Sequence, residues 1–144
     1  MKKFIWAIIL VGAAAVAYWL LSPLFYDREV SEVFQMTPES SVIRSGVFTG
    51  LANHQASGTA KLIKSGDKYI VRLDDDFRVT NGPDLFVHFG KKGEYSAEAR
   101  LGALKGNVGG QNYEVPPEID PSQYDEIWIW CRSFFVPFGV AVLN

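Results

Sequence analysis

The first apolar run of the chain extends from Phe4 to Leu21 without a charged residue. An apolar run of about 18 residues is long enough to cross a bilayer as an α-helix. We therefore predict an N-terminal transmembrane signal-anchor over residues 1–26. Residues 15–17 read Ala-Val-Ala, the small-x-small form of a signal-peptidase site, so a cleaved secretory signal is the alternative. The apolar run continues past that point, which favours an uncleaved anchor.

The charges that flank this run predict its orientation. Lys2 and Lys3 precede it, whereas Asp27 and Glu29 follow it. Because basic flanks are retained in the cytoplasm, we expect a single-pass protein of the cell membrane whose remaining residues lie on the extracytoplasmic side. The membrane is thus the first expected partner.

The pattern changes twice after the apolar run. Residues 27–43 are polar and acidic, with weak helical spacing at Val30, Val33 and Phe34, and predict a polar stalk. Over residues 44–144, short apolar runs are separated by glycine, proline and Asn/Asp clusters, which is typical of an all-β protein. About a hundred residues form one core, so the sequence predicts a single β-sandwich-like domain.

Alternation of apolar and polar positions predicts individual strands in this domain. Ser57–Ile63 and Asp67–Leu73 flank a short polar turn and predict a hairpin. Asn81–Asp84 predicts a turn, because Gly82 precedes a proline and is disfavoured in the helical region. The turn leads into a predicted strand at Leu85–Phe89.

Two short helical turns and two final strands complete the prediction. Ser96–Leu104 favours a helical turn, and the order Asp120-Pro121-Ser122 is typical of a helix start. Strands are expected at Glu126–Ser133 and Phe138–Leu143. Alternate residues of the first of these face opposite sides, with Ile127, Ile129 and Cys131 on one side and Trp128, Trp130 and Arg132 on the other. Both sides are largely apolar, which predicts a central strand.

Composition and motifs exclude several functions. The net charge is −2 and the lysines are scattered, so nucleic acid is not an expected partner. The sequence lacks a Gly-x-Ser-x-Gly elbow and zinc-ligand spacing. Asp74–Asp76 lacks the rest of a calcium loop and is interpreted as a solvated strand end. Gly106–Gly110 fits no nucleotide-binding motif and is interpreted as a flexible loop. The sequence favours a non-enzymatic protein and predicts no metal site.

Three residues remain as candidates for chemistry. His54 and His88 could each be an axial haem ligand or a proton relay, although a structural role is favoured for both. Cys131 is the single cysteine, so it cannot form a disulfide within the chain. It is either a buried core residue or a reactive thiol or cofactor ligand, and its place on the strand favours the core.

Several segments, taken in order, resemble the electron-transfer DM13 domain. They are Gly46-Val47-Phe48, His54 with Ser57–Ala60, Leu73–Phe77, Asn81–Leu85, Gly109–Tyr113, Ile127–Phe134, and Phe138-Gly139 with Ala141. The resemblance covers residues 44–143 and implies a small β-sandwich-like domain. It also implies that Cys131 acts in redox chemistry, as a bare thiol or through a prosthetic group such as haem. The residues themselves indicate no cofactor.

Two hypotheses of function follow. The first is a membrane-anchored extracytoplasmic domain that transfers electrons through Cys131, with an unidentified redox or protein partner. The second is a non-enzymatic extracytoplasmic binding or assembly module in which Cys131 is a buried core residue.

Overall fold

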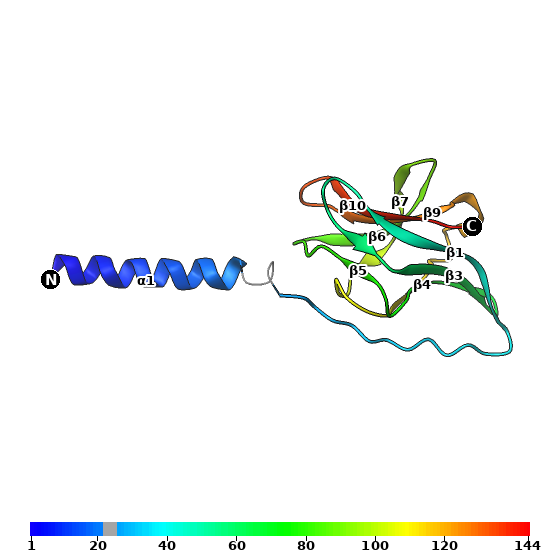
Figure 1. The fold of residues 1–144 in the computed structure, drawn as a ribbon, viewed down its shortest axis with the longest axis horizontal. Coiled ribbons are helices and arrows are strands. Elements are labelled where there is room, and N and C mark those ends of the chain that lie inside the picture. The colour runs from blue at the N-terminus through cyan, green and yellow to red at the C-terminus, as the bar shows by residue number, and fades with distance from the viewer. Residues whose placement is uncertain (22–25) are drawn as a thin grey trace.

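The computed structural model describes residues 1–21 and 26–144, so part of the predicted anchor (residues 22–25) lies outside the described residues. Helix α1 (Lys2–Leu21) stands clear of a β domain whose strands lie between residues 40 and 142 (Figure 1). Within the described ranges, no helix is both long and apolar enough to cross a membrane. The predicted transmembrane helix is therefore not confirmed.

The β domain is built on one antiparallel sheet of eight strands and a two-stranded ribbon. The sheet order is β7-β6-β9-β10-β1-β3-β4-β8, and β2 pairs with β5. The strands are β1 (Ser40–Gly50), β2 (Ala56–Ser57), β3 (Thr59–Ser65), β4 (Lys68–Leu73), β5 (Arg78–Val79), β6 (Leu85–Lys91), β7 (Glu94–Ala103), β8 (Gln111–Glu114), β9 (Glu126–Cys131) and β10 (Val136–Val142). The predicted all-β class is confirmed.

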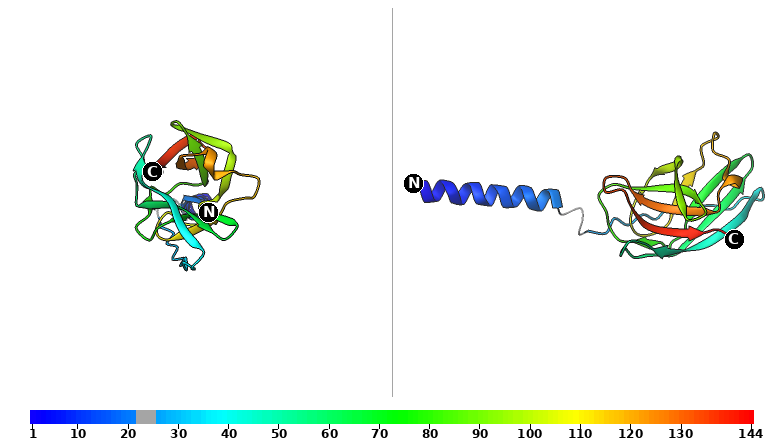
Figure 2. Two further views of the ribbon diagram at one scale, coloured as in Figure 1. Left: turned by 90° about the vertical axis from the view of Figure 1, so that its right-hand side faces the viewer. Right: turned by 90° about the horizontal axis from the view of Figure 1, so that it is seen from above.

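Strand β1 turns the sheet into a nearly closed sandwich (Figure 2). Its first part pairs with β3, and its last three residues, Phe48–Gly50, pair with β10. Gly46 lies where the two pairings meet, and a Cβ atom there would overlap the backbone of Val142. A glycine is therefore required at this corner. At the other edge, the backbone amide of Lys105 donates to the Tyr113 hydroxyl at 3.0 Å, which draws β7 and β8 together.

The order of strands confirms most local predictions. The β3–β4 hairpin is present, and β9 is central because it lies between β6 and β10. The helix start before Ser122 is confirmed as a 3₁₀ helix at Pro121–Gln123, where the Asp120 side chain accepts a hydrogen bond from the Ser122 amide. The predicted helical turn at Ser96–Leu104 is wrong.

That segment instead belongs to strand β7, the edge strand that pairs with β6. Tyr95 lies opposite Gly90, and Ala103 lies opposite Phe86. Its Ala-Glu-Ala-Arg-Leu run favours a helix locally, but pairing with β6 completes the backbone hydrogen bonds of that buried strand. Tertiary pairing thus outweighs local propensity here.

The segment predicted as a polar stalk lies along the domain before it reaches β1. The amide of Val30 donates to the Val108 carbonyl at 2.9 Å, and the amide of Glu32 donates to the Gly110 carbonyl at 2.8 Å. The Glu32 carboxylate accepts from Lys105 Nζ at 2.8 Å. This hydrogen bond lowers the pKa of Glu32. Residues 30–32 are therefore extended and tied to the 105–110 loop rather than helical.

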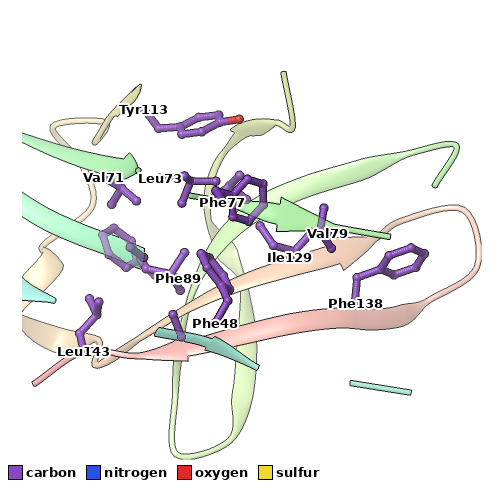
Figure 3. Close-up of a cluster of buried hydrophobic side chains, with 14 of the residues drawn as sticks. Phe48, Val71, Leu73, Phe77, Val79, Phe89, Tyr113, Ile129, Phe138 and Leu143 are labelled. Atoms are coloured by element: carbon purple, nitrogen blue, oxygen red, sulfur yellow. The ribbon is translucent and has the colours of Figure 1, made fainter. Parts of the chain in front are cut away.

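The core lies between the two layers of the sheet (Figure 3). Phe48 and Phe77 meet edge to face, with ring centroids 5.1 Å apart. Phe89 stacks on Tyr124 at one end of the core, and Phe138 lies at the other end (Figure 3). These aromatic side chains supply much of the apolar surface that stabilises a domain of this size.

Candidate functional site

Cys131 is the last residue of β9, and its side chain belongs to the core. Its neighbours across the sheet are Leu85 on β6 and Val136 on β10. The residue is 0% exposed, and it shares the inward face of β9 with Ile127 and Ile129, as the alternation predicted. The thiol is therefore enclosed in the closed domain, one residue before the β9–β10 turn.

A bulge in β10 places an extra aromatic ring beside this cysteine. Pro137 lies opposite Trp130 and Gly139 lies opposite Ile129, so Phe138 is the inserted residue. Its side chain is 3% exposed and belongs to the core. A bulge redirects a side chain that would otherwise alternate. Phe138 here points inward, between the levels of Ile129 and Trp130 and next to the level of Cys131.

Side chains rather than a strand cover this end of the core. The ring of His54 stacks on Phe138, with centroids 3.6 Å apart and planes 9° apart. The turn at Gly82 closes the other side, because a Cβ atom there would lie 2.9 Å from Phe138 Cε1. We call His54, Gly82 and Phe138 the end cap. The sequence analysis singled out each of these three segments but did not predict that they lie in contact.

The outward face of β9 carries a separate aromatic cluster. Trp130 stacks on Tyr95 with centroids 3.8 Å apart. Trp128 Nε1 donates to a Glu126 carboxylate oxygen at 2.8 Å, and the other oxygen accepts from the Gly93 amide at 2.8 Å. Glu126 thereby fixes the β6–β7 turn over the tryptophans. This cluster lies on the opposite side of the sheet from Cys131.

His88 belongs to that outward face. Its Nδ1 atom donates to the Ser96 carbonyl at 2.9 Å. Burial lowers the pKa of His88, and the nearby Arg100 charge lowers it further, while the hydrogen bond to Ser96 opposes both. The ring is therefore neutral at neutral pH. This arrangement fits the structural role predicted for His88.

The residues at Cys131 do not fit a haem group. His88 and Cys131 face opposite sides of one sheet, so they cannot ligate one iron atom. His54 lies face to face with Phe138, a ring stacking that serves the cap. Side chains of the core fill the space around the Cys131 sulfur, and a macrocycle needs open space beside its axial ligand.

The three aspartates after β4 are engaged by neighbouring protein groups. Arg72 donates to Asp74 at 3.0 Å and to Asp75 at 2.7 Å, and Asp76 accepts from the Thr59 amide at 2.9 Å. Among the described residues, no group of three or more His, Cys, Asp or Glu side chains is placed to hold a metal ion.

The sequence analysis missed a buried polar centre at Gln111. This residue is 0% exposed. Its carbonyl oxygen accepts from the amides of Lys105 and Gly106 and from the Tyr113 hydroxyl, and its amide nitrogen donates to the carbonyls of Gly106 and Gly109. Burial raises the pKa of Tyr113, so its hydroxyl stays protonated and donates. The loop predicted to be flexible is thus wrapped around one side chain.

This loop forms one wall of a surface cavity of about 460 Å³. The other walls are the 26–28 segment and the Asn81–Asp84 turn. The Asn107 side chain donates to Asp27 at 2.7 Å across its rim. The signal for the buried polar centre in the sequence was Gln111, which lies between Gly109-Gly110 and the inward-facing Tyr113. A glutamine side chain that faces inward needs backbone hydrogen-bond partners.

Comparison with known proteins identifies the domain. The family model described as "Electron transfer DM13" matches residues 48–143. No curated protein and no solved structure matches the chain. The matched range contains Cys131, the end cap and Gln111, and it covers more than half of the chain. The predicted family is confirmed, and the chain belongs to the electron-transfer DM13 family.

Proposed function

We propose that this protein is a membrane-attached electron-transfer domain in which Cys131 is the redox-active group. Membership of the DM13 family suggests the redox role. The observation that carries the proposal is the position of Cys131, which ends β9 directly before a turn and pairs with Leu85, whose side chain lies against Gly82 of the end cap. The side chains of the end cap can move without breaking the sheet. A partner redox protein would therefore reach the Cys131 thiol at this end of the core.

Complete burial of Cys131 favours a second candidate, a binding or assembly module. A cysteine in apolar surroundings is inert, and free cysteine is among the most buried residue types. In this case the surface cavity beside the Asn81–Asp84 turn, with its polar rim, is the candidate binding site. The oxidation state of Cys131 in the native membrane separates the two functions.

We expect Cys131 to react slowly with a maleimide in the folded protein and rapidly after denaturation, because the thiol is 0% exposed. Cys131→Ala should lower the free energy of unfolding by about 1 kcal/mol, the scale for deleting one small buried group. Phe134→Cys in the Cys131→Ala background is the control, because position 134 is 66% exposed and should label at once.

For electron transfer, the Cys131 thiolate would attack a disulfide of the partner redox protein in the native membrane. A mixed disulfide forms, the other partner sulfur leaves as a thiol, and the two electrons lost by Cys131 reduce that sulfur. Mass spectrometry of the protein trapped in its membrane should find Cys131 both reduced and oxidised, with the ratio following the redox conditions of the cells. A Cys131 that stays fully reduced under all conditions would exclude it as the redox group and favour the binding module.

We further propose that α1 attaches the domain to the cell membrane, with the domain on the extracytoplasmic side. The apolar side chains of α1 are largely exposed, among them Phe4 at 78% and Trp6 at 66%. Exposed apolar surface of this extent in a helix is stable when lipid covers it. Basic residues before the helix and acidic residues after it support the orientation.

Protease added to spheroplasts is expected to digest the β domain and to leave a small N-terminal fragment in the membrane. Domains outside the cytoplasm are accessible in such cells, whereas a cytoplasmic marker protein should survive as the control. Substitution of both Lys2 and Lys3 by Glu should reduce the digested fraction, because it removes the basic flank. Full protection of the wild-type domain would contradict the orientation.

A further inference from the structure

The turn between β9 and β10 exposes two large apolar side chains at the tip of a hairpin. Phe134 is 66% exposed and Phe135 is 75% exposed. Phe135 also has a positive φ of 54°, a left-handed conformation that is unfavourable for a residue with a side chain. Packing within the domain does not offset this cost, because the ring projects from it. We call residues Ser133–Phe135 the aromatic tip.

Hydrogen bonds place the aromatic tip beside the point where the chain from α1 joins the domain. The side chain of Asn81 donates to the Tyr26 carbonyl at 2.8 Å. Asp84 accepts from Arg132 at 2.9 Å and from the Ser133 hydroxyl at 2.9 Å. The Asn81–Asp84 turn therefore holds both Tyr26 and the base of the aromatic tip. The two ends of this turn are at most about 11 Å apart. The β9–β10 turn also lies at the end of the domain nearest to α1 (Figures 1 and 2).

Chain length limits how far the tip can be from α1. From Leu21 to Tyr26 an extended chain covers at most about 18 Å. A tip held near Tyr26 is then within reach of the surface of any bilayer that contains α1. Tyr26 itself is 62% exposed, and aromatic side chains are enriched at the boundary between lipid and water.

The electrostatics of the tip are compatible with contact with lipid. Arg132 forms a two-pronged ion pair with Asp84, at 2.9 and 3.2 Å. The hydrogen bonds from Arg132 and Ser133 lower the pKa of Asp84, so the pair stays charged and mutually neutralised. The aromatic tip therefore carries no uncompensated charge that would oppose its entry into the headgroup region.

We propose that the aromatic tip inserts into the interfacial region of the lipid bilayer and docks the domain on the membrane that holds α1. The proposal rests on the membrane attachment proposed above. Burial of one phenylalanine stabilises only weakly and would not hold a free protein on the membrane. It suffices for a tethered domain, because the tether keeps the local concentration of the tip at the surface high. Docking would turn the end cap toward the bilayer, because Gly82 belongs to the same Asn81–Asp84 turn that holds the tip.

The test uses the full chain in vesicles of phosphatidylcholine. In a Cys131→Ala background, Phe134→Cys is labelled with an environment-sensitive nitrobenzoxadiazole probe. Glu118→Cys carries the same probe as the matched control, because Glu118 is exposed and belongs to the segment between β8 and β9, which reaches the end of the domain away from α1 (Figure 1). Flotation on a density gradient first establishes attachment. We expect at least twofold stronger quenching by doxyl-labelled lipid at position 134 than at position 118.

Phe135→Ser in the chain labelled at position 134 should bring this quenching back toward the level at position 118, which excludes insertion driven by the probe alone. Position 135 is exposed, so the substitution should leave folding intact. A chain that floats but shows equal quenching at both positions would overturn tip docking and leave attachment standing. A chain that does not float would overturn attachment and docking together.

Discussion

Phe138→Ala is expected to lower the free energy of unfolding by about 3–5 kcal/mol, the range for truncation of a buried phenylalanine. The ring is 3% exposed and supports His54 by stacking. Its loss opens a cavity at the level of Cys131, so maleimide should also reach the thiol from the folded state. Urea unfolding measures the first effect, and the labelling rate of Cys131 in dilute buffer measures the second.

Phe89→Ala is the matched control for this experiment. Phe89 is 0% exposed but lies four positions further along β6 than Leu85, the neighbour of Cys131. That separation is about 13 Å along a strand. Both variants should lose similar stability, yet Phe138→Ala should label Cys131 faster. Equal labelling at equal stability would show that the thiol is reached only by global unfolding, and that the end cap is no gate.

Gln111→Leu is expected to destabilise the domain by about 4 kcal/mol or more. The substitution keeps the approximate volume, but it removes the partner of the buried Gly106 amide and of the buried Gly106 and Gly109 carbonyls. Each buried group left without a partner costs about 1–3 kcal/mol. The Tyr113 hydroxyl would also lose its acceptor. The 105–110 loop should then show faster amide hydrogen exchange.

Gln123→Leu provides the same chemical change at an exposed position. Gln123 lies in the 3₁₀ helix, where its side chain donates only to exposed Asp120. Surface substitutions of this kind usually stay within about 0.5 kcal/mol. If Gln111→Leu changes the free energy of unfolding as little as this control does, Gln111 does not organise the 105–110 loop. The shape of the surface cavity would then depend on the 26–28 segment instead.

Periodicity was a good guide to the fold wherever a strand is buried by its own neighbours. The alternation around Cys131 predicted both its inward direction and the central place of β9. The turn at Gly82-Pro83 was predictable because it rests on backbone sterics alone. The helical turn predicted at Ser96–Leu104 is wrong because the local helical preference of this segment is weak. Backbone hydrogen bonds to the otherwise unpaired edge of β6 outweigh it.

The end cap was beyond the reach of the sequence for a different reason. His54, Gly82 and Phe138 meet only because β1, the 81–84 turn and a bulge in β10 end at the same place. Register and bulges depend on pairing between distant strands, and alternation alone would have assigned Phe138 and Gly139 to opposite faces without revealing the insertion. The aromatic tip was visible as two adjacent phenylalanines, but nothing local distinguished a hairpin tip from a strand.

The shared role of β1 has a consequence for biosynthesis. Its Phe48 pairs with Ala141, and Ser45 exchanges backbone hydrogen bonds with Asn144, so the first strand of the sheet closes against residues nearly a hundred positions later. Topologies dominated by such distant pairings fold slowly. During synthesis on the ribosome, the edge of β1 that pairs with β10 stays without hydrogen-bond partners until residues 136–144 emerge. During that interval, the exposed edge is a site where chaperones or a second nascent chain can bind.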